Sequence, residues 1–183
     1  MTTDDLLIAF AEFLSAQDIL TAAEDMKPFL QDWRHMFEGA AVCVLLPRSS
    51  QDVQRIVQIC AEAAVAIVPQ GGNTGLAGGA TPDSSGGSVV LSLARMNRII
   101  DIDRTGLTVT VEAGMVLDTL RAALAEVDRD LPISFAASGS ATLGGILATN
   151  AGGANVLRSG MAGRMVLGLE VVLADGAIGS ELS

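Results

Sequence analysis

The sequence predicts an α+β fold in which a parallel strand–helix–strand unit comes before an antiparallel hairpin. The unit starts with a short apolar run at residues 42–46 and returns to a β-branched run at residues 66–68. Between them, apolar residues recur at helical spacing over residues 53–64, and Ser49 and Asp52 have the spacing of a capping box. A unit of this length implies parallel strands joined by a right-handed crossover.

The second half of the chain predicts antiparallel structure. Residues 99–103 and 107–112 are apolar or alternating runs on either side of Arg104-Thr105-Gly106, which is typical of a hairpin. A plain doubly wound sheet would not contain this hairpin. The other expected elements are strands at 88–93 and 166–173, a turn at 174–176 after the second of these, and an amphipathic helix at 116–127.

Two helices are expected near the N-terminus. Apolar residues at helical spacing predict a helix from Asp4 to about Ala16, with Thr3 as its N-cap. A second helix is expected to begin near Leu20 and to stop before Pro28. The first five residues are acidic rather than basic at their charged positions, so they resemble neither a signal peptide nor a transit peptide. No apolar run reaches the ~18 residues of a membrane span, and a cytoplasmic protein is expected.

The composition argues against nucleic acid as a partner. Eleven basic and twenty-one acidic side chains give a formal net charge of −10, and no basic stripe stands out. In such a field a bound phosphate must be held by local backbone dipoles. Half of the 183 residues are hydrophobic and only 3% are aromatic, so the core must consist mainly of aliphatic side chains and methionine.

The residues that most often serve as catalysts or metal ligands are few. Cys43 and Cys60 lie in apolar periodic segments, which predicts buried thiols rather than a disulfide or a metal pair. His35 is the only histidine and lies two residues after Trp33, the only tryptophan, which favours a packing or surface role for both. Glu170 falls in an expected strand, where a structural or solvent-facing role is the more ordinary one.

The most informative stretch is the glycine-rich segment at residues 68–79. Five glycines allow it to turn tightly, so that consecutive N–H groups can point into one concavity that favours an anion such as a diphosphate. Asn73 and Thr74 add side-chain donors. The segment follows an expected parallel strand at its carboxyl end, where open α/β sheets bind ligands. An isolated run of this kind is often only a surface loop, but a second small-residue run at residues 139–153 favours a ligand site.

Common catalytic motifs are missing from the sequence. It contains no G-x-G-x-x-G at a strand–helix junction, no G-x-x-x-x-G-K-[ST] and no G-x-S-x-G. Histidine and cysteine are too few for a typical zinc site. The remaining pattern is rich in donors and poor in acid–base groups, which indicates cofactor binding rather than autonomous catalysis.

Four stretches in order resemble FAD-linked oxidases of the vanillyl-alcohol-oxidase superfamily, with a PCMH-type FAD-binding domain. The resemblance is to the D-2-hydroxy-acid dehydrogenase branch, which includes D-lactate, glycolate and D-2-hydroxyglutarate enzymes. It covers about residues 32–176. The stretches are Pro69-Gln70-Gly71-Gly72-Asn73-Thr74-Gly75-Leu76, Leu91-Ser92-Leu93-Ala94-Arg95-Met96-Asn97, Gly144 to Gly153, and Val166 to Gly176.

The resemblance implies a fold and a set of binding residues. After an N-terminal helical segment at 1–38, a FAD-binding domain would occupy 39–183, with a small βαβ lobe at about 39–95 and a larger lobe at about 96–183. The larger lobe would contain a mostly antiparallel sheet with flanking helices, and FAD would lie between the lobes. The residues implied to contact FAD are Pro69, Gln70, Gly71, Gly72, Asn73, Thr74, Gly75, Leu76, Ser138, Gly139, Thr142, Gly144, Gly145, Ala148 and Thr149.

The resemblance also implies an activity and its partners. The chain would be the N-terminal, FAD-binding portion of an enzyme that oxidises a D-2-hydroxy acid to the 2-oxo acid by hydride transfer to flavin N5. An external acceptor would then reoxidise the flavin, and a homodimer is one expected assembly. Asn73 stands where members with covalent flavin carry histidine, which implies non-covalent FAD. The catalytic base, the substrate-binding residues and any metal ligands would lie outside this chain, so the chain alone should be inactive.

The sequence also departs from the family. Ala141-Thr142-Leu143 and Ile146 replace residues that are common around the paired glycines, and Ser159 stands where a tyrosine is common. Two alternatives remain open on the residues alone. One is a FAD-dependent sugar or alcohol oxidase, and the other is a non-catalytic interaction module whose glycine-rich turns serve packing.

Overall fold

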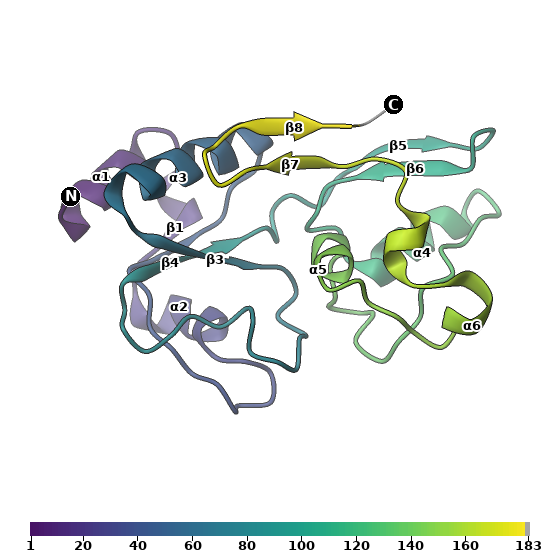
Figure 1. The fold of residues 1–183 in the computed structure, drawn as a ribbon, viewed down its shortest axis with the longest axis horizontal. Helices are drawn as coiled ribbons and strands as arrows, with labels where there is room; N and C mark the ends of the chain where they lie inside the picture. Colours follow the sequence, from purple (N-terminus) through teal and green to yellow (C-terminus); the bar gives the residue numbers. More distant parts are fainter. Residues whose placement is uncertain (182–183) are drawn as a thin grey trace.

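The computed structural model describes residues 1–181, which form two lobes that lie side by side (Figure 1). The small lobe is built on a four-stranded sheet in the order β1-β2-β4-β3. Its strands are β1 (Ile19–Leu20), β2 (Val44–Leu45), β3 (Ala66–Gln70) and β4 (Ser88–Ser92). Strands β2, β4 and β3 are parallel, and β1 is antiparallel to β2. The small lobe therefore contains the expected parallel unit.

The lateral order of the strands differs from the simplest form of the prediction. Strand β4 lies between β2 and β3, so the two strands of the βαβ unit are parallel but do not pair with each other. Every residue of β4 is buried, whereas β3 has exposed positions. A strand whose central residues are all apolar, as Val89, Val90 and Leu91 are in β4, is most stable at the centre of a sheet that is covered on both faces.

Helix α3 (Ser50–Ala63) connects β2 to β3 and has the predicted start. The Ser49 side chain accepts a hydrogen bond from the Asp52 N–H at 3.1 Å. The Asp52 carboxylate accepts from the N–H of Arg48, at 3.0 Å, so the return bond of the capping box is displaced by one residue. Ile56 and Cys60 are the fully buried residues on the inner face of α3.

The N-terminal segment is part of the small lobe's core. Helix α1 (Thr3–Ala11) starts one residue earlier than expected, because Thr2 rather than Thr3 is its N-cap, and it ends well before Ala16. Leu6 and Phe10 pack with Ile56 in one cluster. The short helix η1 (Ala16–Asp18) then leads into β1.

Helix α2 (Ala23–Leu30) corrects the prediction of a helix that stops before a proline. Pro28 lies inside α2. The helix has only eight residues, so the proline removes a single intrahelical hydrogen bond near the end, and the chain leaves the helix two residues later. Figure 1 shows α2 on the opposite side of the sheet from α1 and α3.

The larger lobe contains antiparallel pairs, as expected, together with short helices. The hairpin of β5 (Ile99–Asp103) and β6 (Thr108–Val111) is antiparallel, as is the pair of β7 (Glu170–Val172) and β8 (Ile178–Ser180). The helices are α4 (Leu117–Ala125), α5 (Leu143–Ala148), α6 (Val156–Ser159) and the 3₁₀ helix η2 (Ala162–Met165). Strand β7 is shorter than the expected 166–173, because β8 provides only three partner residues.

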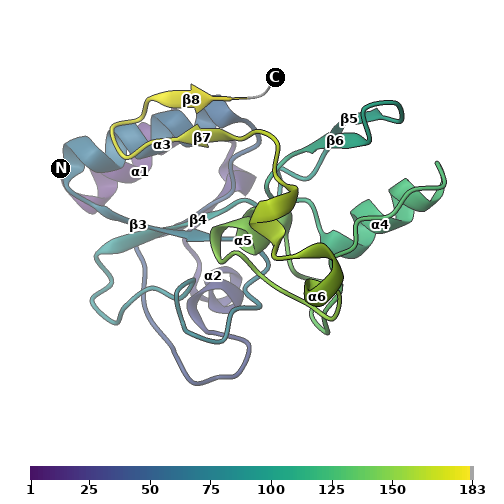
Figure 2. The ribbon, with the colours of Figure 1, turned by 45° about the vertical axis from the view of Figure 1, so that its right-hand side comes forward.

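The β7–β8 hairpin leaves the larger lobe and lies along α3 of the small lobe, which both views show (Figure 1, Figure 2). The apolar cores are separate. One cluster lies between the small-lobe sheet, α1 and α3, and two others lie around α4 and α5. Among residues 1–181, no helix is both long and apolar enough to cross a membrane.

Candidate cofactor site

The loop after β3 presents a row of backbone donors. Within residues 1–181, no backbone N–H from Gly71 to Leu76 donates a hydrogen bond to a protein acceptor. The first four residues of this loop, through Thr74, are half-buried. Asn73 adopts a left-handed conformation with φ of 51°, which curves the main chain at the middle of the loop. Consecutive N–H groups in such a curved segment favour an anion.

Two amide side chains hold this loop in place. The buried Gln70 side chain donates to the carbonyl oxygens of Phe29 at 2.9 Å and Ala80 at 2.7 Å. Both of its N–H groups are therefore used within the protein, and Gln70 supports the loop rather than offering a free donor. Asn73 donates through Nδ2 to the carbonyl oxygen of Gln31 at 2.8 Å.

The second small-residue bend runs from Ser138 to Thr142 and continues into α5. Main-chain bonds fix it to the segment before α4, because Leu117 N–H donates to Ala141 O at 3.0 Å and Leu143 N–H donates to Met115 O at 2.9 Å. Gly144 lies against Ala113, with its N–H 2.7 Å from the Ala113 carbonyl oxygen. A side chain at position 144 would meet the Ala113 Cβ at 2.8 Å, so only glycine permits this approach.

The two bends come from different lobes and are in contact. A Cβ placed on Gly72 would overlap the Ser140 carbonyl group, and one placed on Gly71 would overlap the Thr142 hydroxyl. The N–H of Gly145, which has no acceptor among residues 1–181, also lies on this side, with its nitrogen 3.8 Å from such a Cβ on Gly71. Glycine at positions 71 and 72 is therefore required for the lobes to approach this closely.

Thr142 carries an unsatisfied polar group at this contact. The residue is 4% exposed, and its hydroxyl oxygen has no hydrogen-bond partner among the described residues. A buried hydroxyl without a partner is costly and needs an explanation. Together with the unpaired N–H groups of Gly71 to Leu76, it forms a set of neutral donors that fits the diphosphate of a dinucleotide.

The remaining residues expected at the site differ in what they offer. Ser138 donates to the Asp118 carboxylate at 2.9 Å, and the Thr149 hydroxyl donates back to the Gly145 carbonyl at 2.8 Å. Pro69 lies within β3, before the loop begins. Four further positions lie on the exposed or half-exposed surface of the two bends: Gly75, Leu76, Gly139 and Ala148.

Sequence reasoning missed a turn that supports the loop. The Asp32 carboxylate accepts hydrogen bonds from the N–H groups of Phe37 at 2.6 Å, Met36 at 2.7 Å and Arg34 at 3.2 Å. The bond from Phe37 is the main cause of a lowered Asp32 pKa; burial opposes it, and the bonds from Met36 and Arg34 add to it. The sequence signal for this turn is Asp32 itself, because an aspartate side chain can accept hydrogen bonds from the N–H groups two to five residues later.

A cavity of about 470 Å³ lies between this turn and the loop. Lys27, Trp33, His35 and Asn73 are among the residues that line it. His35 is exposed, and its Nδ1 lies 2.8 Å from Gln31 Oε1. Within residues 1–181, no group of three or more His, Cys, Asp and Glu side chains could hold a metal ion.

The cysteines are buried free thiols, as predicted. Burial raises the pKa of Cys43 to about 12, and the neighbouring Cys60 adds to this increase. Burial also raises the pKa of Cys60, to about 11. Both belong to the small-lobe core. Neither thiol is therefore available as a nucleophile or a ligand at the site.

Residues 41–179 match the FAD-binding domain family, and the chain belongs to this family. FAD is the cofactor that the family binds, and the neutral donor set at the two bends fits its diphosphate. The fold is shared with solved structures of alkyldihydroxyacetonephosphate synthase (TM-score 0.89, 21% identity, covering 98% of this chain and 35% of that one). It is also shared with a variant of berberine bridge enzyme (TM-score 0.80, 19% identity, covering 98% and 38%).

Three curated relatives share more sequence identity with the chain than these solved structures do. The chain is 38% identical over 176 residues to D-2-hydroxyglutarate dehydrogenase of Xanthomonas citri pv. viticola, covering 96% of this chain and 37% of the relative. It is 39% identical over 178 residues to the mitochondrial D-2-hydroxyglutarate dehydrogenase of Bos taurus, covering 97% and 32%. It is 38% identical over 179 residues to the D-2-hydroxyglutarate–pyruvate transhydrogenase of Saccharomyces cerevisiae, covering 97% and 36%. The chain thus spans about a third of the length of these relatives.

Proposed function

We propose that this chain is the FAD-binding portion of a flavin-dependent dehydrogenase that oxidises a D-2-hydroxy acid to the corresponding 2-oxo acid. One observation carries the proposal: among residues 1–181, the N–H groups from Gly71 to Leu76 have no hydrogen-bond acceptor, and Gly71 at the start of this row lies against the Thr142 hydroxyl of the other lobe, which also has no partner. Membership of the FAD-binding domain family supports the cofactor, and the names of the relatives support the substrate class. The first substrate to test is D-2-hydroxyglutarate.

The residues of this chain would hold and orient the cofactor. The N–H groups of Gly71 to Leu76 would bind the diphosphate, and the Thr142 hydroxyl and the Gly145 N–H would donate from the opposite lobe. When bound, FAD would supply a two-electron acceptor for the oxidation of the carbon that bears the substrate hydroxyl. Neutral main-chain donors suit a chain with a net charge of −10, because they need no basic residue to offset the phosphate charge.

We also propose that FAD is held without a covalent bond. The Asn73 amide is not a nucleophile, and it is occupied by its hydrogen bond to Gln31. Both cysteines are buried and protonated at neutral pH. The base that removes the substrate hydroxyl proton would come from the two thirds of the relatives' length to which this chain has no counterpart.

The test uses the full-length natural protein. Purified protein should show flavin absorbance bands, and heat or acid should release all of the FAD into the supernatant. Under anaerobic conditions, D-2-hydroxyglutarate should bleach the flavin band, whereas L-2-hydroxyglutarate and glucose should leave it unchanged. A protein that binds no FAD would contradict the proposal. If glucose reduces the flavin and no D-2-hydroxy acid does, the proposed substrate class is wrong and a sugar is the substrate.

A further inference from the structure

The two lobes have separate apolar cores, and they approach each other at the cofactor-binding bends. The small-lobe core and the two clusters of the larger lobe have no residue in common. The chain crosses between the lobes once in the segment after β4, which ends at Arg98, and Arg98 pairs with Glu112 at the base of the β5–β6 hairpin (Nη2 to Oε1, 2.7 Å). The Arg98 side chain is largely exposed and that of Glu112 is 9% exposed. Both residues belong to the larger lobe, so this ion pair fixes the end of the crossing to the larger lobe and does not join the two lobes.

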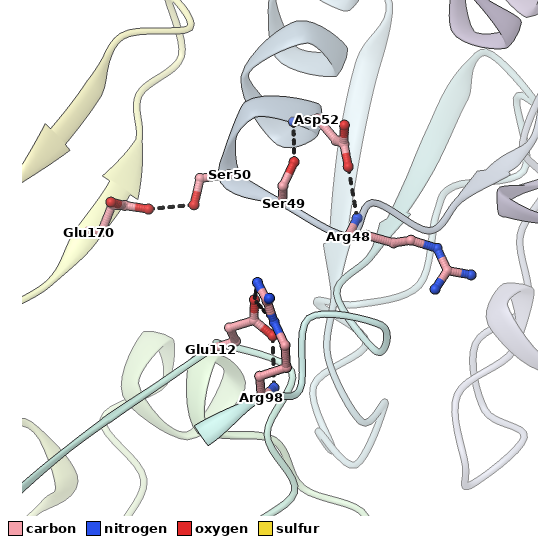
Figure 3. Close-up of polar contacts among 7 residues, drawn as sticks. All are labelled: Arg48, Ser49, Ser50, Asp52, Arg98, Glu112 and Glu170. Carbon is pink, nitrogen blue, oxygen red and sulfur yellow. Dashed lines mark hydrogen bonds and ion pairs between the residues drawn. The ribbon is translucent and has the colours of Figure 1, made fainter. Parts of the chain in front are cut away.

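The β7–β8 hairpin makes a second connection, because it extends from the larger lobe onto α3. The Ser50 hydroxyl, at the first residue of α3, donates to Glu170 of β7 (Figure 3). One helical turn further, Gln54 Nε2 donates to the carbonyl oxygen of Gly176 at 2.7 Å. Gly176 has φ of 82° and lies against the Gln58 side chain, so the turn between β7 and β8 follows the surface of α3.

The hairpin is attached to α3 outside the apolar core of the small lobe. Among the described residues, no side chain of β7 or β8 belongs to the small-lobe core or is packed against it. The apolar side chains at Leu169, Val171 and Leu173 are 41–50% exposed, on the side of the strand away from Glu170. The hydrogen bonds between the hairpin and α3 therefore involve the side chains of Ser50, Gln54 and Glu170.

We infer that the β7–β8 hairpin is a strap that sets the distance between the two cofactor-binding bends, and that Ser50, Gln54 and Glu170 are positioning residues for FAD. The inference rests on the proposed function. A diphosphate must meet the donors of both bends at once, and these donors belong to different lobes. If only a fraction of the free protein has the bends together, the apparent dissociation constant rises in inverse proportion to that fraction. The strap keeps that fraction high without touching the ligand.

The test measures FAD affinity in the full-length apoprotein, by quenching of flavin fluorescence. The double variant Ser50→Ala/Gln54→Ala should bind FAD about tenfold more weakly, as expected for the loss of two hydrogen bonds. Gln51→Ala is the matched control, because the Gln51 side chain is exposed on the same helix and makes no hydrogen bond among residues 1–181. Its affinity should equal that of the wild type.

Two further variants separate positioning from simple stability. Glu170→Gln keeps an oxygen that can accept the Ser50 hydrogen bond and should bind FAD nearly as well as the wild type, whereas Glu170→Ala should weaken binding severalfold. Ser49→Ala removes the N-cap of α3 and should lower the melting temperature of the apoprotein while leaving FAD affinity unchanged. Small-angle scattering of the double-variant apoprotein should show a larger radius of gyration.

The outcomes separate a failure of the strap from a failure of the proposed function. If the wild type binds FAD and the double variant binds it equally well, the strap is wrong and the proposed function stands. If Ser49→Ala weakens binding as much as the double variant, the effect is one of helix stability and the strap is again wrong. If the wild type binds no FAD, the proposed function and the strap fall together.

Discussion

The contact between Gly72 and the second bend allows the sharpest test of the site. In Gly72→Ala, the new methyl group would overlap the Ser140 carbonyl oxygen, and it would lie 2.7 Å from the carbonyl carbon and 3.2 Å from the Ala141 Cα. Ordinary contact begins at 3.4 Å. The opposing atoms are main chain, so no rotamer change relieves the overlap, and the two bends must move apart.

The expected cost follows from overpacking of well-packed sites, which is about 1–3 kcal/mol. If the lobes separate to relieve the overlap, this energy appears as a loss of FAD affinity of about tenfold to a hundredfold. The assay is titration of the full-length apoprotein with FAD, together with a thermal melt without FAD. Gly79→Ala is the control, because position 79 has no atom within 4 Å of an added Cβ and lies outside the proposed donor set. Equal FAD affinity in Gly72→Ala and Gly79→Ala would refute the proposed contact between the bends.

Three other predictions test the site and the core. Thr142→Val removes the unpartnered hydroxyl and should leave the apoprotein as stable or up to about 1 kcal/mol more stable, while FAD affinity in a fluorescence titration falls about fivefold to tenfold; a loss of stability with unchanged affinity would contradict this. Cys43 and Cys60 should react with a thiol reagent at about pH 8 more than ~100-fold faster in denatured than in native protein, because their native pKa values are about 12 and 11, and fast native labelling would be the contrary result. The lowered pKa of Asp32 means that its carboxylate stabilises the fold above the unfolded pKa, near ~4, and that this stabilisation is lost as the pH falls through the folded value. The difference in unfolding free energy between wild type and Asp32→Asn should therefore shrink between about pH 6 and about pH 3 in denaturant titrations, and a constant difference would show that the charge is not involved.

Local patterns predicted most of the individual elements, because their causes are local. The Ser49 cap, the amphipathic face of α3 and the β5–β6 hairpin each depend on residues close together in the sequence. The position of β4 between β2 and β3 could not be predicted in this way, since two parallel strands joined by a helix leave room for a third strand between them. The helical turn around Pro28 was missed because the short α2 can tolerate one lost hydrogen bond.

The candidate site shows the same division. The glycine-rich stretches identified the two bends, but nothing in the sequence indicated that position 72 would lie against Ser140, because that contact joins different lobes. The sequence also could not show that Gln70 is saturated by Phe29 and Ala80 while Thr142 is unpartnered. Residue type gives the number of donors, and only the fold decides which of them are already used.

Hydrogen–deuterium exchange of the full-length protein, with and without FAD, tests most directly whether main-chain amides of both lobes bind the cofactor. In peptides covering residues 70–77 and 138–146, the amides that have no protein acceptor among residues 1–181 include those of residues 71–76 and Gly145. These amides should exchange quickly in the apoprotein and at least about tenfold more slowly with saturating FAD, because bound amides are protected. The hairpin tip at Thr105 should be unaffected. Saturating FAD that leaves both peptides at their apoprotein rates would contradict the proposed binding mode.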